Sequence, residues 1–297
     1  MRRLERWLFA PGSAERLATL RIGLCAILAV RLNRGIYSAL SSQPAALFRP
    51  RSFMSLLSSQ PPRGVVIAAQ VIGIAAAIAA VVGLRARVTL PVAWLAGLFL
   101  NGMVTSNGKV MHNDVMLLLA MVPLLVVPVS DAWSIDVRGR GAGPAGARVS
   151  LRYGWPVRTA MVVVAGGYFF SGFAKLHNSG ISWVTSGNLR WVLYASSDSQ
   201  SSANHLALFV ADRAWLSHLF AAGALLLEIS FPVVLFRRGL APYFALGAVA
   251  LHTGIWLTMG LDYWAWVGTA LVVLIDWPAV LDRVRSGARA GAPATAT

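Results

Sequence analysis

The sequence predicts an all-α membrane protein with about eight transmembrane helices and both termini in the cytoplasm. Of its 297 residues, 57% are hydrophobic and only 12% are charged. A soluble fold cannot hide so much apolar surface, whereas a helix that crosses a bilayer needs roughly 20 apolar residues. The net charge of +15 does not indicate nucleic-acid binding, because the basic residues lie in loops between apolar runs, where they set the topology and contact anionic headgroups.

Eight apolar runs reach the length of a membrane span. They cover residues 17–38, 64–84, 88–105, 114–129, 156–175, 217–236, 240–259 and 263–280. The fourth run is short and contains Pro123 and Pro128. In the long loop 176–216, two amphipathic pieces at 191–194 and 206–215 predict short interfacial helices.

These runs divide the chain into three parts. Residues 1–16 are expected to form a cytoplasmic N-terminal segment, 17–282 the transmembrane domain, and 283–297 a disordered tail. Segment 138–148, rich in Gly and Arg, predicts a flexible loop. The single cysteine, Cys25, cannot form an internal disulfide.

The distribution of basic residues tests this topology. With the N-terminus in the cytoplasm, the cytoplasmic segments carry 16 of the 26 basic residues and the opposite side carries 6. Cytoplasmic loops of membrane proteins are enriched in Lys and Arg. Four basic residues fall within spans; Arg21, Arg31 and Arg34 are expected to be structural, and Lys175 is the fourth. We therefore expect a multi-pass protein of a bacterial inner or plasma membrane.

Several polar side chains gather toward the non-cytoplasmic ends of the predicted spans. Charged groups inside a membrane are costly, so each is a candidate for function or for bonding between helices. His112, Asn113 and Asp114 open the fourth span from the outer side, and Lys175 closes the fifth on that side. His177, Asn178 and Asp262 also lie on this side, whereas Glu228 and His252 lie within the sixth and seventh spans.

Lysine usage distinguishes Lys175 within this set. Only two of the 26 basic residues are lysines, Lys109 and Lys175. A desolvated lysine can release its proton and act as a base, whereas arginine cannot. Lys175 shares a helix face with Tyr168, Ser171 and Gly172, and the small residues would let a helix or a ligand approach. The alternative is that Lys175 only extends its charged end to the interface.

The other candidates also have structural interpretations. Asn113 or Asp114 could cap the following helix, and Glu228 or His252 could join helices by hydrogen bonds. His112, His177, His252 and Asp262 could in principle converge on a metal, but no pair has the spacing typical of metal ligands, so no metal is expected.

Several short motifs follow one another in a fixed order along the chain. They are Lys109-Val-Met-His112-Asn113-Asp114, Trp133-Ser-Ile-Asp136, Tyr168-Phe-Phe-Ser-Gly172-Phe-Ala-Lys175-Leu followed by Trp183, Glu228-Ile-Ser-Phe-Pro232, and the late-span His252. Their order resembles the "horizontally transferred transmembrane" (HTTM) domain family, which includes the vitamin K-dependent γ-glutamyl carboxylase. The similarity covers roughly residues 5–282.

The resemblance implies a role for each of these positions. It makes Lys175 the base toward a lipid quinol such as reduced menaquinone, assisted by His112 and His252, on the non-cytoplasmic side. Six further residues would bind the cofactor: Tyr168, Gly172, Asn113, Asp114, Trp183 and Glu228. Because the sequence ends soon after its last predicted span, we expect the quinol-handling core without carboxylation of a protein substrate.

Three hypotheses follow for the function. The first is a quinol-linked membrane enzyme or enzyme subunit in the bilayer, acting with a separately encoded extramembrane or redox partner. The second is a non-catalytic membrane partner or immunity-type protein, in which the polar residues only fasten helices together. The third, a small-solute transporter, is disfavoured because no internal repeat is detectable.

Overall fold

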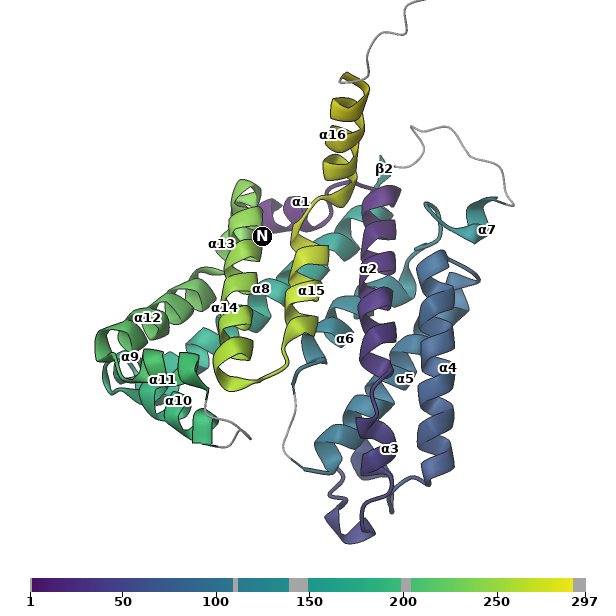
Figure 1. Cartoon of the computed structure of the whole chain (residues 1–297). Helices are drawn as coiled ribbons and strands as arrows, with labels where there is room; N and C mark the ends of the chain where they lie inside the picture. Colours follow the sequence, from purple (N-terminus) through teal and green to yellow (C-terminus); the bar gives the residue numbers. More distant parts are fainter. Residues whose placement is uncertain (1, 109–111, 139–148, 199–203, 291–297) are drawn as a thin grey trace, which may run out of the picture. The chain divides into compact units, whose positions relative to one another are not determined.

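The computed structural model describes residues 2–108, 112–138, 149–198 and 204–290. Lys109, most of the predicted 138–148 loop and residues 291–297 of the predicted tail lie outside this part. The chain forms two units: the first comprises Met1–Met111, Met121–Ala160 and Ile275–Thr297, and the second comprises His112–Ala120 and Met161–Leu274. Apart from turns and connecting loops, the described residues form helices and one short antiparallel pair, in which β1 (Gly12–Ser13) pairs with β2 (Val149–Ser150). Figure 1 labels the elements of both units.

Among the described residues, four helical segments are long and apolar enough to cross a membrane. They are α4 (Arg63–Val82), α5 (Ala86–Ser106), α8 (Leu151–Ser179), and the stretch formed by η5 (Arg238–Leu240) with α14 (Ala241–Met259). The number rises to as many as six if two bent pairs each count as one span. These pairs are α11 (His205–Ala211) with α12 (Ala214–Ser230), and α15 (Trp264–Leu274) with α16 (Trp277–Ala290). The predicted class, an all-α protein with several membrane-length apolar helices, is confirmed.

Several predicted spans are interrupted rather than continuous. The run 17–38 is divided between α2 (Ala14–Leu32) and α3 (Ile36–Leu40), and the run 114–129 between α6 (Val115–Met121) and η3 (Val122–Val126). The run 217–236 breaks at Pro232, between α12 and α13 (Val233–Phe236), because proline has no amide hydrogen to continue the helix. The predicted tail from residue 283 is helical as far as Ala290.

The first unit is built on α2, α4 and α5, which pack side by side in Figure 1. Its smaller elements are α1 (Arg2–Leu8), η1 (Ala45–Leu47), η2 (Ser52–Leu56) and α7 (Ile135–Arg138). The carboxylate of Asp136 accepts hydrogen bonds from the backbone amides of Arg85, at 2.8 Å, and Ala86, at 3.2 Å. These amides start α5 and have no acceptor within the helix, so the Trp133–Asp136 motif serves as its N-terminal cap.

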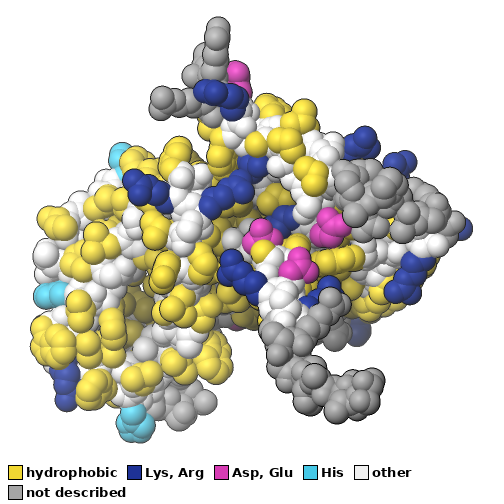
Figure 2. Space-filling model, turned by 90° about the horizontal axis from the view of Figure 1, so that it is seen from above, with side chains coloured by type: hydrophobic (Ala, Val, Ile, Leu, Met, Phe, Trp, Pro, Cys, Tyr) yellow, Lys and Arg dark blue, Asp and Glu magenta, His cyan; other side chains and the backbone are white. Residues whose placement is uncertain are grey.

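Large apolar side chains point outward from the long helices. On α4, Val71 is 60% exposed, and Ile72 and Ile78 are also exposed. Figure 2 shows hydrophobic side chains over much of the face that it draws. Exposed apolar rows on helices of membrane length are expected where the surrounding solvent is lipid.

The second unit holds the second half of α8 together with α12, α14 and α15. Three short helices, α9 (Ser182–Thr185), α10 (Asn188–Asp198) and α11, gather near one end of α12 (Figure 1). Short helices are thus present at both predicted pieces, although the piece 206–215 is divided where α11 ends at Ala211 and α12 begins at Ala214. The Asn204 side-chain amide donates to the carbonyls of Leu257, at 2.8 Å, and Thr258, at 3.3 Å, which ties this group to the end of α14.

Candidate functional site

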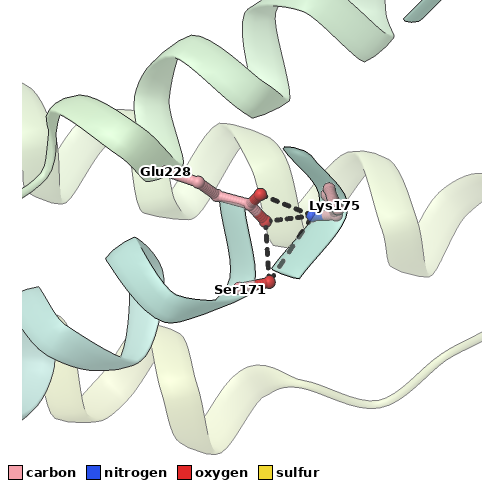
Figure 3. A network of polar contacts seen from close by, with 3 residues as sticks. All are labelled: Ser171, Lys175 and Glu228. Atoms are coloured by element: carbon pink, nitrogen blue, oxygen red, sulfur yellow. Dashed lines mark hydrogen bonds and ion pairs between the residues drawn. The ribbon is translucent and has the colours of Figure 1, made fainter. Parts of the chain in front are cut away.

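Lys175 and Glu228 form a close ion pair between α8 and α12 in the second unit. The Lys175 ammonium donates to both carboxylate oxygens of Glu228, with an Nζ–Oε1 distance of 2.5 Å. Ser171, one turn before Lys175, donates to Oε1 at 3.2 Å and accepts from Nζ at 3.5 Å. Figure 3 shows the three side chains pointing toward one another. We call Ser171, Lys175 and Glu228 the lysine cluster.

The two ends of the ion pair differ in exposure. The Glu228 side chain is 6% exposed, whereas that of Lys175 is 24% exposed. The Lys175 ammonium also lies 5.0 Å from the centre of the Trp183 ring, within the range of a cation–π contact. Lys175 is therefore the accessible end of the pair, and Trp183, predicted from its motif, lies beside it.

Gly172 explains how α12 comes so close to α8. A Cβ at this position would lie 2.9 Å from the Cβ of Glu228 and 3.1 Å from Cγ1 of Ile229. Both distances are shorter than ordinary carbon–carbon contacts, so only glycine fits without displacement. The small face predicted beside Lys175 thus accommodates a neighbouring helix.

Tyr168 lies two turns before Lys175 and is fully enclosed. Its ring stacks on Phe231, with centroids 4.0 Å apart, and meets Trp266 edge-on at 5.7 Å. Its hydroxyl lies 3.1 Å from Nε2 of His252 on α14. Tyr168 therefore links α8 to α12, α14 and α15, and its contact with His252 brings together two residues that were predicted separately.

A second polar contact joins His112 to the connection between α14 and α15. Nε2 of His112 lies 3.2 Å from the hydroxyl of Tyr263, and the indole of Trp266 donates to the carbonyl of His112 at 3.1 Å. The Tyr263 hydroxyl can donate to this nitrogen in the tautomer that carries its proton on Nδ1. The rings of Tyr263 and His252 lie 5.5 Å apart, so both histidines border Tyr263.

Asn113 and Asp114 are adjacent in sequence but differ in burial and in their contacts. Asn113 is buried, and its side-chain amide donates to the carbonyl of Asp262 in the α14–α15 connection. Asp114 directly precedes α6 and is half-buried. The Asn113 amide therefore ties the start of α6 to this connection, which differs from the capping role expected as the alternative, because a cap accepts hydrogen bonds from the first amides of its helix.

Two sets of residues, each built around residues that the sequence predicted, thus lie within one unit. The lysine cluster occupies one stretch of α8 and α12, and the histidine set (His112, His252, Tyr168 and Tyr263) lies among α6, α8, α14 and α15. Phe231, Tyr263 and Trp266 were not predicted as site residues, although Phe231 lies in the Glu228–Pro232 motif. His177 stacks on Phe173 instead, with centroids 5.8 Å apart. Within the described ranges, no three His, Cys, Asp or Glu side chains are grouped as metal ligands.

A cavity of about 350 Å³ opens beside His252, Asp262 and Tyr263. Its volume falls in the range of small-molecule sites. Lys175 does not line it. A comparison of the chain with models of protein families, with curated proteins and with solved structures found no match.

Proposed function

We propose that this chain is an integral membrane enzyme, or the membrane subunit of one, that exchanges protons with a lipid quinol through Lys175. The observation that carries the proposal is the lysine cluster, a close ion pair held between two apolar helices and accessible at its lysine end. The motif resemblance to the HTTM family supplies the substrate class, a quinol such as reduced menaquinone.

The proposed topology has eight spans with both termini in the cytoplasm. Contacts within each unit support it, because they join segments that the arginine distribution assigns to the same side. The cytoplasmic pairs are Gly12 with Ser150, and Asp136 with Arg85. The outer pairs are Arg49 with Ser106, at 2.6 Å, and Asn113 with Asp262. With this topology, the lysine cluster and the histidine set are near the outer surface.

The chemistry requires a group that takes a proton from a phenolic oxygen. In the ion pair, Lys175 carries a proton that can move along the 2.5 Å contact to Glu228. This transfer leaves a neutral amine beside a neutral carboxylic acid, and low-dielectric surroundings disfavour separated charges. The free amine then accepts the phenolic proton at Nζ, while Ser171 holds the Glu228 carboxyl group in place.

The residues around Lys175 fit this role. Partial exposure gives an incoming molecule access to Nζ, and the Trp183 ring offers an apolar wall beside it. A bound quinol would supply the phenolic proton. By the motif resemblance, His252 and His112 would stabilise negative charge that develops on the oxygen; in the structure each contacts a tyrosine hydroxyl.

The same ion pair also favours a second candidate, a non-catalytic membrane partner in which Lys175 and Glu228 only join α8 to α12. Removal of one member of a buried pair leaves an uncompensated charge, which typically costs about 3–5 kcal/mol. If this candidate is correct, substitutions of Lys175 or Glu228 should change only the stability of the protein.

Two measurements on purified protein in nanodiscs separate these candidates. Mass spectrometry should detect a co-purified quinone. Anaerobic titration with menaquinol should produce the absorbance change that accompanies loss of a phenolic proton. Lys175→Arg keeps the cation and its ion pair but cannot release a proton, so the variant should bind menaquinol without this change.

The control is His205→Phe, a substitution at an exposed residue that starts α11. It should behave as the unaltered protein in both measurements. The absence of co-purified quinone together with no saturable menaquinol binding would overturn the quinol proposal. An undiminished absorbance change in Lys175→Arg would instead remove only the role of Lys175 as base.

A further inference from the structure

The last described helix, α16, carries its apolar and its charged side chains on different faces. Val280, Leu281 and Val284 are exposed, and Val284 has 66% of its surface accessible. Successive residues of an α-helix are about 100° apart around the axis, so Val280 and Leu281 lie within about 60° of Val284. Trp277 lies two turns before Val284 on the same side. These four side chains form one apolar row, which we call the α16 stripe.

Two exposed arginines border the α16 stripe. Arg283 and Arg285 lie about 100° to either side of Val284 around the helix axis. Asp282, the single carboxylate of α16, lies about 160° from Val284 and therefore on the opposite face, as does Ser286. An arginine at such a border can lay its apolar stem along the stripe and hold its charged end beside a phosphate. The charges next to the stripe are thus basic on both sides.

The position of α16 in the chain brings a lipid surface within its reach. Only Ile275 and Asp276 separate it from α15, an apolar helix in the run 263–280 that predicts the eighth span. Three of the four residues 282–285 are charged, which makes it costly for α16 to continue through the hydrocarbon interior. Within its own unit α16 contacts α2 and extends beyond it (Figure 1). An amphipathic helix at the end of a span is typical of segments that lie at the membrane surface.

We propose that α16 binds the anionic lipids of the cytoplasmic leaflet. The α16 stripe enters the boundary between headgroups and acyl chains, while Arg283 and Arg285 contact lipid phosphates on its two sides. An anionic leaflet supplies both an apolar layer and phosphates along the whole length of the helix, and it attracts basic segments close to its surface. The inference uses no residue of the lysine cluster or the histidine set, so it can fail while the quinol proposal stands.

Spin labels on α16 of the full chain in nanodiscs test this inference. In a Cys25→Ala background, Leu281→Cys and Val284→Cys place a label on the α16 stripe, whereas Ala279→Cys and Ser286→Cys place it on the opposite face. Electron paramagnetic resonance measures how often each label collides with oxygen, which enters lipid, and with a nickel chelate, which stays in water. In discs that contain phosphatidylglycerol, the oxygen-to-nickel ratio should be at least about threefold higher on the stripe.

Lipid charge and the two arginines should control this difference. Discs of phosphatidylcholine alone should lower the ratio at Val284→Cys by about twofold or more, because the attraction to phosphatidylglycerol is lost. Arg283→Gln with Arg285→Gln should have the same effect in discs that contain phosphatidylglycerol. The control is Arg237→Gln with Arg238→Gln, which removes the same number of exposed charges ahead of α14 and should leave the ratio unchanged.

Each of four results would overturn the proposal. Ready access of the nickel chelate to both faces would place α16 in water. A preference for oxygen at all four positions would make α16 the second half of a membrane span. Poor access of both reagents to the stripe would mean that protein covers it, and spin–spin broadening would identify that protein as a second copy of the chain. Ratios that depend on neither phosphatidylglycerol nor the arginine pair would exclude anionic headgroups as the ligand.

Discussion

At the scale of single residues, the lysine cluster depends on a residue that takes no part in its chemistry. Gly172 lies between Ser171 and Lys175 in sequence and faces the backbone region of α12 that carries Glu228. The Nζ–Oε1 distance of 2.5 Å requires the two helices to approach within the reach of these side chains. The absence of a side chain at residue 172 therefore sets the geometry of the ion pair.

Gly172→Ala should destabilise the protein. The new methyl group would meet the Glu228 Cβ at 2.9 Å, and both helices would have to move apart. Overpacking of this kind costs about 1–3 kcal/mol, more than alanine gains in helix propensity. Thermal unfolding in detergent, followed by circular dichroism, should show a lower Tm.

Gly166→Ala on the same helix provides the control. A Cβ there meets only the Phe170 ring, at 3.8 Å, which is an ordinary contact. This variant should be unchanged or slightly more stable, because alanine favours helix by about 1 kcal/mol over glycine. A Gly172→Ala protein as stable as Gly166→Ala would contradict the close approach of α12.

At the scale of elements, sequence periodicity predicted which segments are helical better than where they break. Proline is not polar, so the apolar pattern of the run 217–236 continues across Pro232, although the helix stops there. The Lys175–Glu228 contact was also beyond prediction, because the rotation of each helix about its axis is set by packing. Both residues were singled out from the cost of charge in a span, but their pairing depends on Gly172.

Burial of charged residues in α2 could not be predicted from apolar content either. Its charged residues lower that content, yet Arg21 and Arg31 are buried within the first unit. Arg21 is fully buried and donates to the carbonyls of Val129, at 2.8 Å, and Trp133, at 2.6 Å. It also reaches the carbonyls of Ala132 and Val81, at 3.3 and 3.4 Å. The structural role expected for Arg21 is thus to bond α2 to these carbonyls. An arginine enclosed in this way does not face lipid.

Arg21→Leu should remove the donor from the segment that follows η3 and from the end of α4. Each buried carbonyl left without a partner costs about 1–3 kcal/mol, so the loss should reach roughly 3 kcal/mol or more. Expression level and Tm in detergent are the measurements. Arg87→Leu, at an exposed arginine of α5, should change neither, and equal effects of the two substitutions would show that Arg21 does not hold these elements together.

At the scale of the whole molecule, the contacts within each unit and the distribution of arginines lead to the same proposed topology by independent arguments. Arginine counts depend on charge in loops, whereas the pairings of Asp136 with Arg85 and of Asn113 with Asp262 depend on where side chains meet. Neither argument depends on how apolar α2 and α6 are. A topology measurement therefore tests the spans that hydropathy identifies least clearly.

Labelling of single cysteines with a membrane-impermeant maleimide provides this measurement. Cys25 is fully buried and is first replaced by alanine, which leaves a background without thiols. Ser55→Cys and Thr185→Cys, at exposed positions that the proposed topology places outside the cell, should then react in intact cells. Arg87→Cys and Ser286→Cys, also exposed, should react only after permeabilisation. Labelling of Thr185→Cys only after permeabilisation would place the lysine cluster near the cytoplasmic surface, and a partner or substrate would then have to reach Lys175 from that side.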